Sequence, residues 1–298
     1  MIRSAIIVIN YRNSVLTAQF VENELSKLTE QFYVVIVNNQ ADDESNDYMK
    51  IHLHATLISD DSYVANPYNR YIIPSATNLG FAKANNLAVD FVSKYLNADY
   101  LLFTNNDISI KEPNTIQCLI RKLEENQVIG MIGPQVRGTN GDYQTPFPYK
   151  PFWDTYVRMY AYTPFLTPRK KAKRFMLDYP QCAKEGYHYR IMGSFFMMRA
   201  VDYKAIGGMD SNTFLYAEEM ILAERLKAIG KKVYYYPNVS VIHQHGATTK
   251  QTMTKGSIRN EKLRSELYYY HHYMHEPMWK LMLGQTLYKL MMLLKRLE

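Results

Sequence analysis

Hydrophobic positions in the first hundred residues follow two alternating patterns. Short, nearly continuous apolar runs, typical of buried strands, occupy Ala5–Asn10, Tyr33–Asn38 and Tyr100–Thr104. Apolar residues with helical spacing occupy Val15–Leu28 and Ala82–Tyr95. Because strands that alternate with helices form βαβ units, the pattern predicts an α/β fold with a mixed, mostly parallel sheet flanked by helices.

The pattern is lost between residues 133 and 190, where prolines and tyrosines interrupt it. A stretch this long without regular structure is uncommon in a compact domain unless it covers or binds a substrate, so we expect an acceptor-side insert here. Regular segments then return in the order Ile191–Arg199 as a strand, a helix containing Glu219, and strand segments at Val233–Tyr236 and Ser240–His243.

The C-terminal segment Pro277–Glu298 predicts an amphipathic helix of unusual composition. Its apolar arc is wide, and its polar positions form one narrow stripe: Lys280, Gly284, Gln285, Lys289 and Arg296. Such a helix can pack on the preceding domain, form the seam of a homodimer or lie in a membrane interface, and the sequence leaves all three open. We therefore expect a catalytic domain over residues 1–250 and a basic helical extension over residues 251–298.

Composition and charge indicate the cellular location and the kind of partner to expect. The chain has 298 residues, 47% of them hydrophobic, which is enough for a sizeable core. Cys118 and Cys182 lack CxxC spacing, the N-terminus does not resemble a signal peptide, and no apolar run reaches membrane-spanning length, so we expect a cytoplasmic protein. The net charge of +7 and the basic run Pro168–Arg174 suit an anionic membrane surface. No nucleic-acid-binding motif is found, so no nucleic-acid partner is expected.

Polar residues that follow the strands are the candidates for chemistry. Asn105, Asn106 and Asp107 come directly after a hydrophobic strand. A carboxylate there can bind Mg²⁺ or Mn²⁺ together with a diphosphate, although Asn and Asp are also common in ordinary turns. His243 can supply an imidazole ligand, but a lone histidine after a strand is more often structural.

Two helix starts carry further candidates. Asn78, Gly80 and Asn85 combine a glycine with amides at the start of a helix, where backbone N–H groups favour anions. Glu218 and Glu219 begin the later helix. Carboxylates at a helix N-terminus are stabilised by the helix dipole, so this pair alone indicates ordinary helix chemistry as readily as catalysis.

The motifs stand in a familiar order. They are VINYRN at the first strand, NNQADDES from Asn38, NLGFAKANN from Asn78, NND from Asn105, and Gly207–Arg225 followed by His243. Together they resemble the inverting family-2 glycosyltransferases of the GT-A fold, in the rhamnosyl- and galactofuranosyltransferase-like branch. The resemblance covers about residues 5–250 and is weakest over the insert.

The resemblance implies a role for each matching residue. Glu219 would be the catalytic base, with Glu218 beside it contacting sugar hydroxyls, and Asp107 and His243 would hold Mn²⁺ or Mg²⁺. The other donor-binding positions it implies are Asn10, Tyr11, Asn38, Asn78, Gly80, Phe81, Asn85, Asn105 and Asn106.

We therefore expect a metal-dependent, inverting transfer of a hexosyl group from a UDP- or dTDP-linked donor to a growing, lipid-linked cell-surface glycan, at the inner face of the plasma membrane. Three residues depart from the family pattern: Glu219 replaces an aspartate, Ile221 stands at an often acidic position, and Asn38 replaces an aspartate. These departures motivate the alternative of an inactive scaffold that binds a nucleotide sugar or a partner protein. A nucleotidyltransferase is disfavoured because the chain lacks a Gly-rich, basic N-terminal loop.

Overall fold

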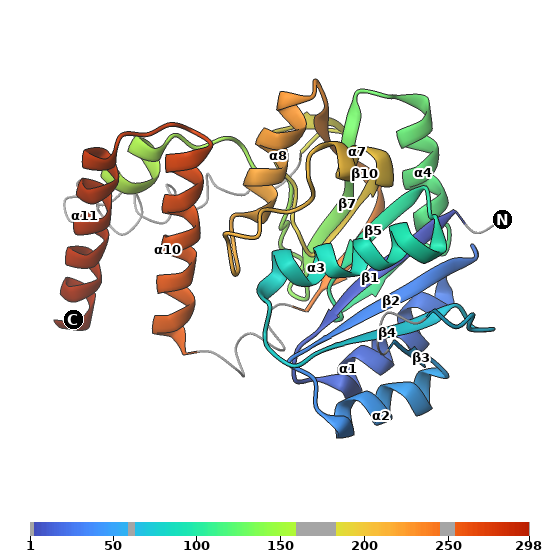
Figure 1. Cartoon of the computed structure of the whole chain (residues 1–298). Helices are drawn as coiled ribbons and strands as arrows, with labels where there is room; N and C mark the ends of the chain where they lie inside the picture. Colours follow the sequence, from blue (N-terminus) through green and yellow to red (C-terminus); the bar gives the residue numbers. More distant parts are fainter. Residues whose placement is uncertain (1–2, 59–62, 159–182, 245–253, 298) are drawn as a thin grey trace.

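The computed structural model describes residues 3–58, 63–158, 183–244 and 254–297 (Figure 1). The basic run Pro168–Arg174, the expected domain boundary at residue 250 and the side chain of Arg296 lie outside the described part.

One large mixed sheet organises the molecule. Its strands lie in the order β3-β4-β2-β1-β5-β9-β7-β10-β6, and β8 pairs with β10. The half from β3 to β5 is parallel, and β9 enters antiparallel between β5 and β7. The strands are β1 (Ser4–Asn10), β2 (Phe32–Asn39), β3 (Thr56–Leu57), β4 (Arg70–Ser75), β5 (Tyr100–Thr104), β6 (Ile108–Ile110), β7 (Ile129–Gly138), β8 (Gly186–His188), β9 (Phe195–Arg199) and β10 (Lys232–His243).

Helices cover both faces of the sheet and extend beyond it. The α-helices are α1 (Ser14–Gln19), α2 (Asp43–Leu53), α3 (Gly80–Phe91), α4 (Thr115–Glu125), α7 (Ala200–Ala205), α8 (Glu218–Ala228), α10 (Lys255–His272) and α11 (Met278–Leu297). Shorter π- and 3₁₀-helical turns are η1 (Phe20–Glu24), η2 (Leu25–Lys27), η3 (Val92–Leu96) and η4 (Trp153–Arg158).

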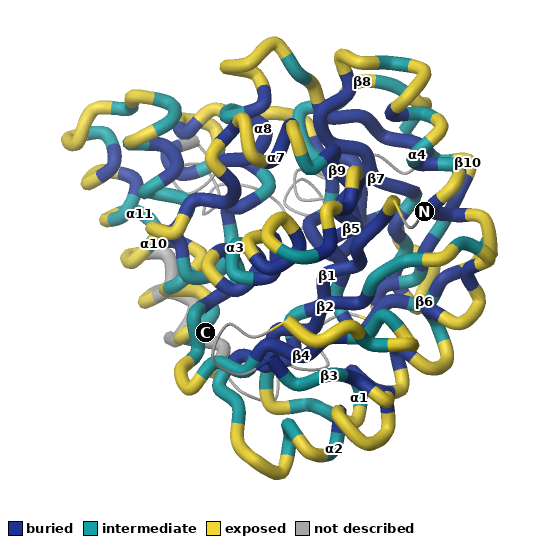
Figure 2. Tube along the Cα trace, turned by 45° about the vertical axis from the view of Figure 1, so that its right-hand side comes forward, coloured by how far each residue is buried: buried dark blue, intermediate teal, exposed yellow. Residues whose placement is uncertain are grey.

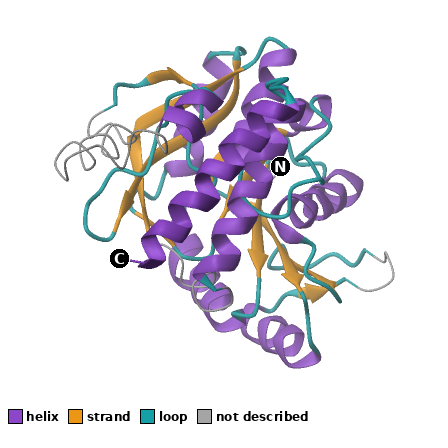
Figure 3. Cartoon of the chain, turned by 90° about the vertical axis from the view of Figure 1, so that its left-hand side faces the viewer, coloured by secondary structure: helices purple, strands orange, loops and turns teal. Residues whose placement is uncertain are grey.

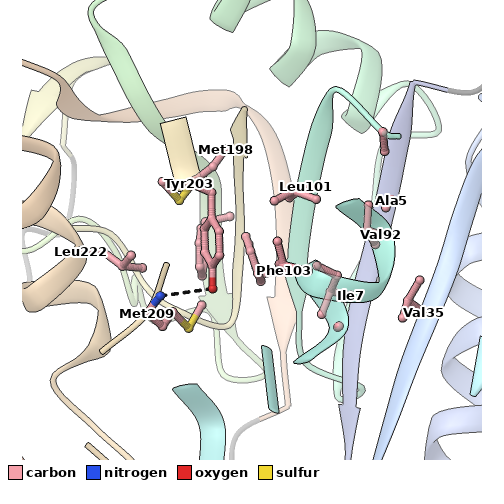
Figure 4. Packing of buried hydrophobic residues seen from close by; sticks show 14 of the residues in the cluster. Ala5, Ile7, Val35, Val92, Leu101, Phe103, Met198, Tyr203, Met209 and Leu222 are labelled. Carbon is pink, nitrogen blue, oxygen red and sulfur yellow. Dashed lines mark hydrogen bonds between the residues drawn. The ribbon is translucent and has the colours of Figure 1, made fainter. Parts of the chain in front are cut away.

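Alternating side chains of the central strands build a separate core on each face. Along β1, Ala5 and Ile7 join one buried cluster, whereas Ile6 and Val8 join the other. The first of these clusters is drawn in Figure 4, where β1 residues lie near Phe103 of β5. Figure 2 shows the central strands buried and the outer faces of the helices exposed. A strand buried on both faces reads as a continuous apolar run, which is why β1, β2 and β5 were recognisable from the sequence.

The expected α/β fold is confirmed, but three local predictions are wrong. The predicted strand Ile191–Arg199 is regular only as β9, because its first four residues form a loop. The two predicted segments Val233–Tyr236 and Ser240–His243 are one strand, β10, with an irregular register between Tyr236 and Ser240. Residues 133–138 are not part of an irregular insert, since β7 continues through Gly138.

The two C-terminal helices share a third hydrophobic cluster with the insert and α8. Phe152 and Tyr156 contribute from the insert, Ile221 from α8, Tyr270 from α10 and Leu281 from α11. Figures 1 and 3 show α10 and α11 side by side at one end of the molecule. Among the described residues, no helix is both long enough and apolar enough to cross a bilayer.

Gly284 sets the closest approach of α11 to this cluster. A Cβ atom there would lie 2.5 Å from the Phe152 ring and 2.9 Å from Tyr156. Phe152 is fully buried and cannot move aside without disturbing its neighbours. The face of α11 that contains Gly284 and Leu281 therefore packs on the domain, as one of the three alternatives expected. The predicted single polar stripe is wrong, because Gly284 lies on this packed face whereas Lys289 is exposed on the other side of the helix.

We expect Gly284→Ala to lower the free energy of unfolding by about 1–3 kcal/mol, as overpacking of a filled core does. Gly256→Ala is the matched control, because a Cβ at Gly256 in α10 would meet only Thr254 Oγ1 at 3.9 Å. Alanine favours the helix over glycine, so the control should be neutral or slightly stabilising. Thermal and urea unfolding measure both; equal stability changes in the two variants would contradict the fit.

Candidate active site

Three of the predicted donor-binding asparagines meet in one buried amide network at the ends of β1 and β2. The strand register pairs Asn10 with Asn38, and Asn10 Nδ2 donates to Asn38 Oδ1 at 2.7 Å. Thr17 Oγ1 donates to Asn10 Oδ1 at 2.7 Å and accepts from Asn106 Nδ2 at 2.8 Å. The carboxyl ends of parallel strands thus bring distant sequence positions to one edge, where ligands of such sheets bind.

The network limits what Asn38 can offer a ligand. Its Nδ2 donates to Ser45 Oγ and Asn46 Oδ1 at the start of α2, which occupies both amide protons. Only the carbonyl oxygen, with its second lone pair, retains the capacity to accept another hydrogen bond. Tyr11, which follows Asn10, is half-buried, and the Arg12 guanidinium lies 5.5 Å from the centre of its ring.

The Asn78 loop is held by a residue that the sequence analysis missed. Asn39 Nδ2 donates to Asn78 Oδ1 at 2.9 Å, and Asn39 Oδ1 accepts from Leu79 N at 2.7 Å. Asn78 Oδ1 also accepts from Gly80 N at 3.0 Å. The sequence signal for Asn39 was its position directly after Asn38. Consecutive side chains of a strand point to opposite faces, so the two asparagines reach different neighbours.

Gly80 and Phe81 attach this loop to the segment that precedes Glu218. Gly80 has a φ of +77°, and a Cβ there would lie 2.5 Å from Phe214 O. Phe81 N donates to Phe214 O at 2.8 Å, and Asn85 Nδ2 donates to Phe81 O at 2.9 Å within α3. The N–H groups of Gly80 and Phe81 therefore bond within the protein, and they hold the loop rather than present themselves to an anion.

Asp107 and His243 are brought face to face by strand pairing. Ile108 of β6 lies opposite His243 of β10, and His243 Nε2 lies 3.3 Å from Asp107 Oδ1. Both side chains are buried. On its other side, His243 Nδ1 contacts Gln144 Oε1 at 2.9 Å. His243 is thus held between the Asp107 carboxylate and the Gln144 side chain.

This pair fits a divalent cation. An imidazole and a carboxylate, both ligand types that divalent cations accept, lie side by side with His243 Nε2 3.3 Å from Asp107 Oδ1. Mg²⁺ and Mn²⁺ are commonly held by one or two protein ligands, with substrate phosphates completing the shell. The described residues contain no cluster of three or more side chains that could hold a metal ion.

Glu219 is held by a loop that approaches it closely. Gly193 N donates to Glu219 Oε1 at 3.0 Å, and a Cβ at Gly193 would lie 2.6 Å from that oxygen. Asn105 N donates to Ser194 O at 2.9 Å. A backbone hydrogen bond thus joins the loop that contacts Glu219 to the loop that carries Asp107.

The chain enters α8 through two left-handed residues. Tyr216 and Ala217 have φ values of +74° and +71°, a conformation that costs side-chain-bearing residues roughly 1–2 kcal/mol each. Such strain persists where surrounding contacts over-determine the backbone, and it clusters at functional sites. It places Glu218 and Glu219 in the first turn of α8, so the sequence was right that the pair begins a helix.

Glu218 differs sharply from its neighbour. Its side chain is buried, and Oε1 has no hydrogen-bond partner among the described residues. Burial, with the negative charge of Glu219 as a second cause, raises the pKa of Glu218 from 4.5 to about 8. Glu218 is therefore a neutral acid at pH 7, whereas Glu219 is only half-buried.

Asp210 ties the approach to α8 to the C-terminal helices. Asp210 Oδ2 accepts from Tyr273 OH at 2.6 Å and from Tyr268 OH at 3.0 Å, and it lies 3.3 Å from Arg225 Nη2. Burial alone would raise the pKa of Asp210, but the hydrogen bonds from Tyr273, Asn212 and Tyr268 lower it overall. Asp210 was part of a recognised motif, yet its bond to α10 could not be foreseen, because the tyrosines lie about sixty positions away.

Comparison with solved structures defines the class. A mannosyltransferase, PcManGT from Pyrobaculum calidifontis, solved with GDP-Man and Mn²⁺, aligns over 96% of this chain and 73% of its own with a TM-score of 0.58 and 12% identity. TarS of S. aureus aligns over 91% and 72%, with a TM-score of 0.52 and 12% identity. The fold is that of the GT-A glycosyltransferases.

Sequence relatives narrow the class. Rhamnosyltransferase WbbL of Escherichia coli is 27% identical over 172 residues, 55% of this chain and 60% of the relative. An N-acetylglucosaminyl-diphospho-decaprenol L-rhamnosyltransferase of Mycobacterium tuberculosis is 25% identical over 194 residues, 61% of each chain. The match thus spans about three fifths of these relatives, and no family model matches the chain. The expected resemblance to family-2, rhamnosyltransferase-like glycosyltransferases is confirmed.

The buried acid predicts a pH-dependent stability difference for Glu218→Gln. A group whose pKa is raised on folding costs stability as the pH rises from its unfolded pKa to its folded pKa, here from about 4.5 to about 8. Glutamine mimics the neutral acid and escapes that cost. We expect the variant to gain stability relative to the parent steadily between pH 5 and pH 8, measured by thermal unfolding. Glu44→Gln on the exposed face of α2 is the control, and a pH-independent difference at Glu218 would refute its burial as a neutral acid.

Proposed function

We propose that this chain is a metal-dependent, inverting glycosyltransferase that moves a rhamnosyl or similar hexosyl group from a nucleotide-diphosphate donor to a hydroxyl of a lipid-linked glycan. The observation that carries the proposal is the hydrogen bond between Asn105 N and Ser194 O. It joins the loop of Asp107, a candidate metal ligand, to the loop that holds Glu219, a candidate base. The names of the sequence relatives support the rhamnosyl group, and one of them supports a diphospho-lipid acceptor.

Glu219 would act as the general base. An acceptor hydroxyl is a weak nucleophile until a carboxylate removes its proton, and the N–H of Gly193 fixes one oxygen of Glu219 so that the other faces the substrate. The acceptor oxygen bonds to the anomeric carbon while the bond from that carbon to the diphosphate oxygen breaks. A single displacement of this kind inverts the anomeric configuration.

Asp107 and His243 would hold the metal ion, which when bound neutralises charge on the departing diphosphate. The remaining donor contacts would come from the strand-end edge: Tyr11 and the carbonyl of Asn38 toward the base, and the Asn78 loop toward the sugar. A uracil or thymine N–H could donate to that carbonyl, so a UDP- or dTDP-linked donor is proposed.

The roles of Glu219 and Asp107 are tested by Glu219→Gln and Asp107→Asn. Loss of a general base or of a metal-bound diphosphate contact typically costs 10²–10⁴-fold in turnover, so both variants should fall by at least about 100-fold. Release of nucleoside diphosphate from dTDP-rhamnose and UDP-sugars, with Mn²⁺ and with chelator, provides the measurement. Glu44→Gln should keep parental turnover.

Two results would contradict the assignment. Parental turnover in either variant would remove the role given to that residue. Donor binding by calorimetry without any metal-dependent release of nucleoside diphosphate, tested over a range of donors and acceptors, would favour the alternative of an inactive binding scaffold.

The outward face of α11 supports a peripheral membrane contact. Trp279, Met282, Leu290 and Leu293 are each more than half exposed, on the side opposite Gly284. Lys289 is exposed at the edge of this apolar face. An apolar helix face with a cationic border binds the interface of an anionic bilayer, and this location suits a lipid-linked acceptor at the inner face of the plasma membrane.

The membrane contact is tested by Trp279→Ser/Leu290→Ser, two changes that leave the packed face of α11 intact. Because burial of each side chain in the interface contributes roughly 1.5–3 kcal/mol, we expect the variant to lose at least tenfold in binding to phosphatidylglycerol vesicles. Ile51→Ser, at an exposed site in α2, should bind as the parent does. If the parent is a dimer in solution and the variant a monomer with unchanged vesicle binding, the face is a homodimer seam instead.

A further inference from the structure

The C-terminal helix α10 contacts the segment of chain that leads into α8. Ser265 of α10 is buried, and its Oγ donates to Leu215 O at 2.8 Å. Earlier in the same segment, Asp210 Oδ2 accepts from Tyr268 OH at 3.0 Å. Residues 210–217, which we refer to as the α8 entry, are therefore held by α10 at two points.

Two consecutive carbonyl groups near the end of the α8 entry are bonded by two different helices. Phe81 N, at the start of α3, donates to Phe214 O at 2.8 Å. Ser265 donates to the next carbonyl, that of Leu215, from α10. The entry lies between these two helices (Figure 1). The hydrogen bonds from α3 and α10 thus fix the backbone immediately before the left-handed residues at positions 216 and 217.

The left-handed residues determine where α8 begins and where Glu219 lies. Ile221 N donates to Ala217 O at 3.0 Å, which places Glu219 in the first turn of the helix. Its Oε1 then accepts from Gly193 N at 3.0 Å. A left-handed backbone is unfavourable for residues that carry side chains, so it persists only where contacts outside the turn hold it. The position of Glu219 therefore depends on the hydrogen bonds that hold the α8 entry.

We propose that Ser265 is a positioning residue for Glu219, because its hydroxyl holds the α8 entry in the conformation that brings Glu219 to Gly193. The proposal rests on the proposed function, in which Glu219 is the general base. Ser265 acts through the backbone of Leu215 and needs no contact with the substrates. Displacement of a reacting group by about 1 Å can lower turnover about 100-fold. The bond from Ser265 thus contributes to the rate of transfer and leaves the binding of the donor unchanged.

Ser265→Ala tests the role, and Tyr270→Phe is the matched control. Tyr270 OH donates to Lys150 O at 2.8 Å, so the control also removes a bond from a buried hydroxyl of α10 to a backbone carbonyl, but one outside the α8 entry. We expect Ser265→Ala to lower kcat at least about tenfold and to leave KM for the donor within about twofold of the parental value. Tyr270→Phe should keep the parental kcat. Thermal unfolding of both variants compares their stabilities.

Amide hydrogen exchange tests the positioning without any turnover. The Gly193 amide donates to Glu219, so its rate of exchange reports whether the carboxylate stays in place. We expect Ser265→Ala to speed exchange of the Gly193 and Ile221 amides at least about twofold, as loss of one hydrogen bond does. Tyr270→Phe should leave both rates at the parental value. If the alanine variant unfolds below the assay temperature, Ser265→Cys takes its place, because a thiol keeps the side-chain shape and donates only weakly.

Three results would overturn the positioning role of Ser265. They are a parental kcat in Ser265→Ala, an equal loss of kcat in Tyr270→Phe, and unchanged exchange of the Gly193 amide in Ser265→Ala. The second would show that any loosening of α10 slows the reaction. Failure of the proposed function gives a different result: the parent would show no turnover with any donor and acceptor, while exchange at Gly193 would still respond to Ser265→Ala.

Discussion

The arrangement of the candidate site depends on one close contact, which joins the Gly193 loop to Glu219. The loop has no side chain at Gly193, so its N–H reaches Glu219 Oε1 at 3.0 Å, and the next carbonyl accepts from Asn105. A Cβ would occupy the space of the carboxylate. Three chain segments far apart in sequence are thereby fixed against one another. Hydrogen bonds to an ionised group are worth more than neutral ones, which stabilises this junction despite partial burial.

The junction between the Gly193 loop and Glu219 explains the strained backbone at the start of α8. Two consecutive left-handed residues cost free energy that a smoother turn would avoid. In exchange, the first turn of α8 points one glutamate at Gly193 and buries the other. The same segment is fixed at Phe214 by the Asn78 loop and at Asp210 by Tyr268 in α10 and Tyr273 directly after it. A backbone held on both sides can keep a conformation that it would not adopt alone.

The sequence predicted the fold well because its central strands are buried on both faces. Ala5–Asn10 and Tyr100–Thr104 have the composition of such strands, and their sequence pattern predicts no other type of element. It predicted Asp107 and His243 as a pair only through family resemblance. Their contact arises from the antiparallel pairing of β6 with β10, over 130 positions apart. It could not distinguish Glu218 from Glu219 by chemistry either, because burial, which separates the two, is a property of the packed helix.

Charge and exposure give the molecule a consistent orientation. The apolar face of α11 is opposite its packed face, and α10 lies between α11 and α8 (Figure 1). If the proposed membrane contact is made through α11, a lipid-linked acceptor would reach Glu219 from the side of the C-terminal helices. The nucleotide sugar would bind on the opposite side, at the ends of β1 and β2. On the proposed function, the two anionic substrates would approach from separate directions, which would reduce the repulsion between their diphosphates.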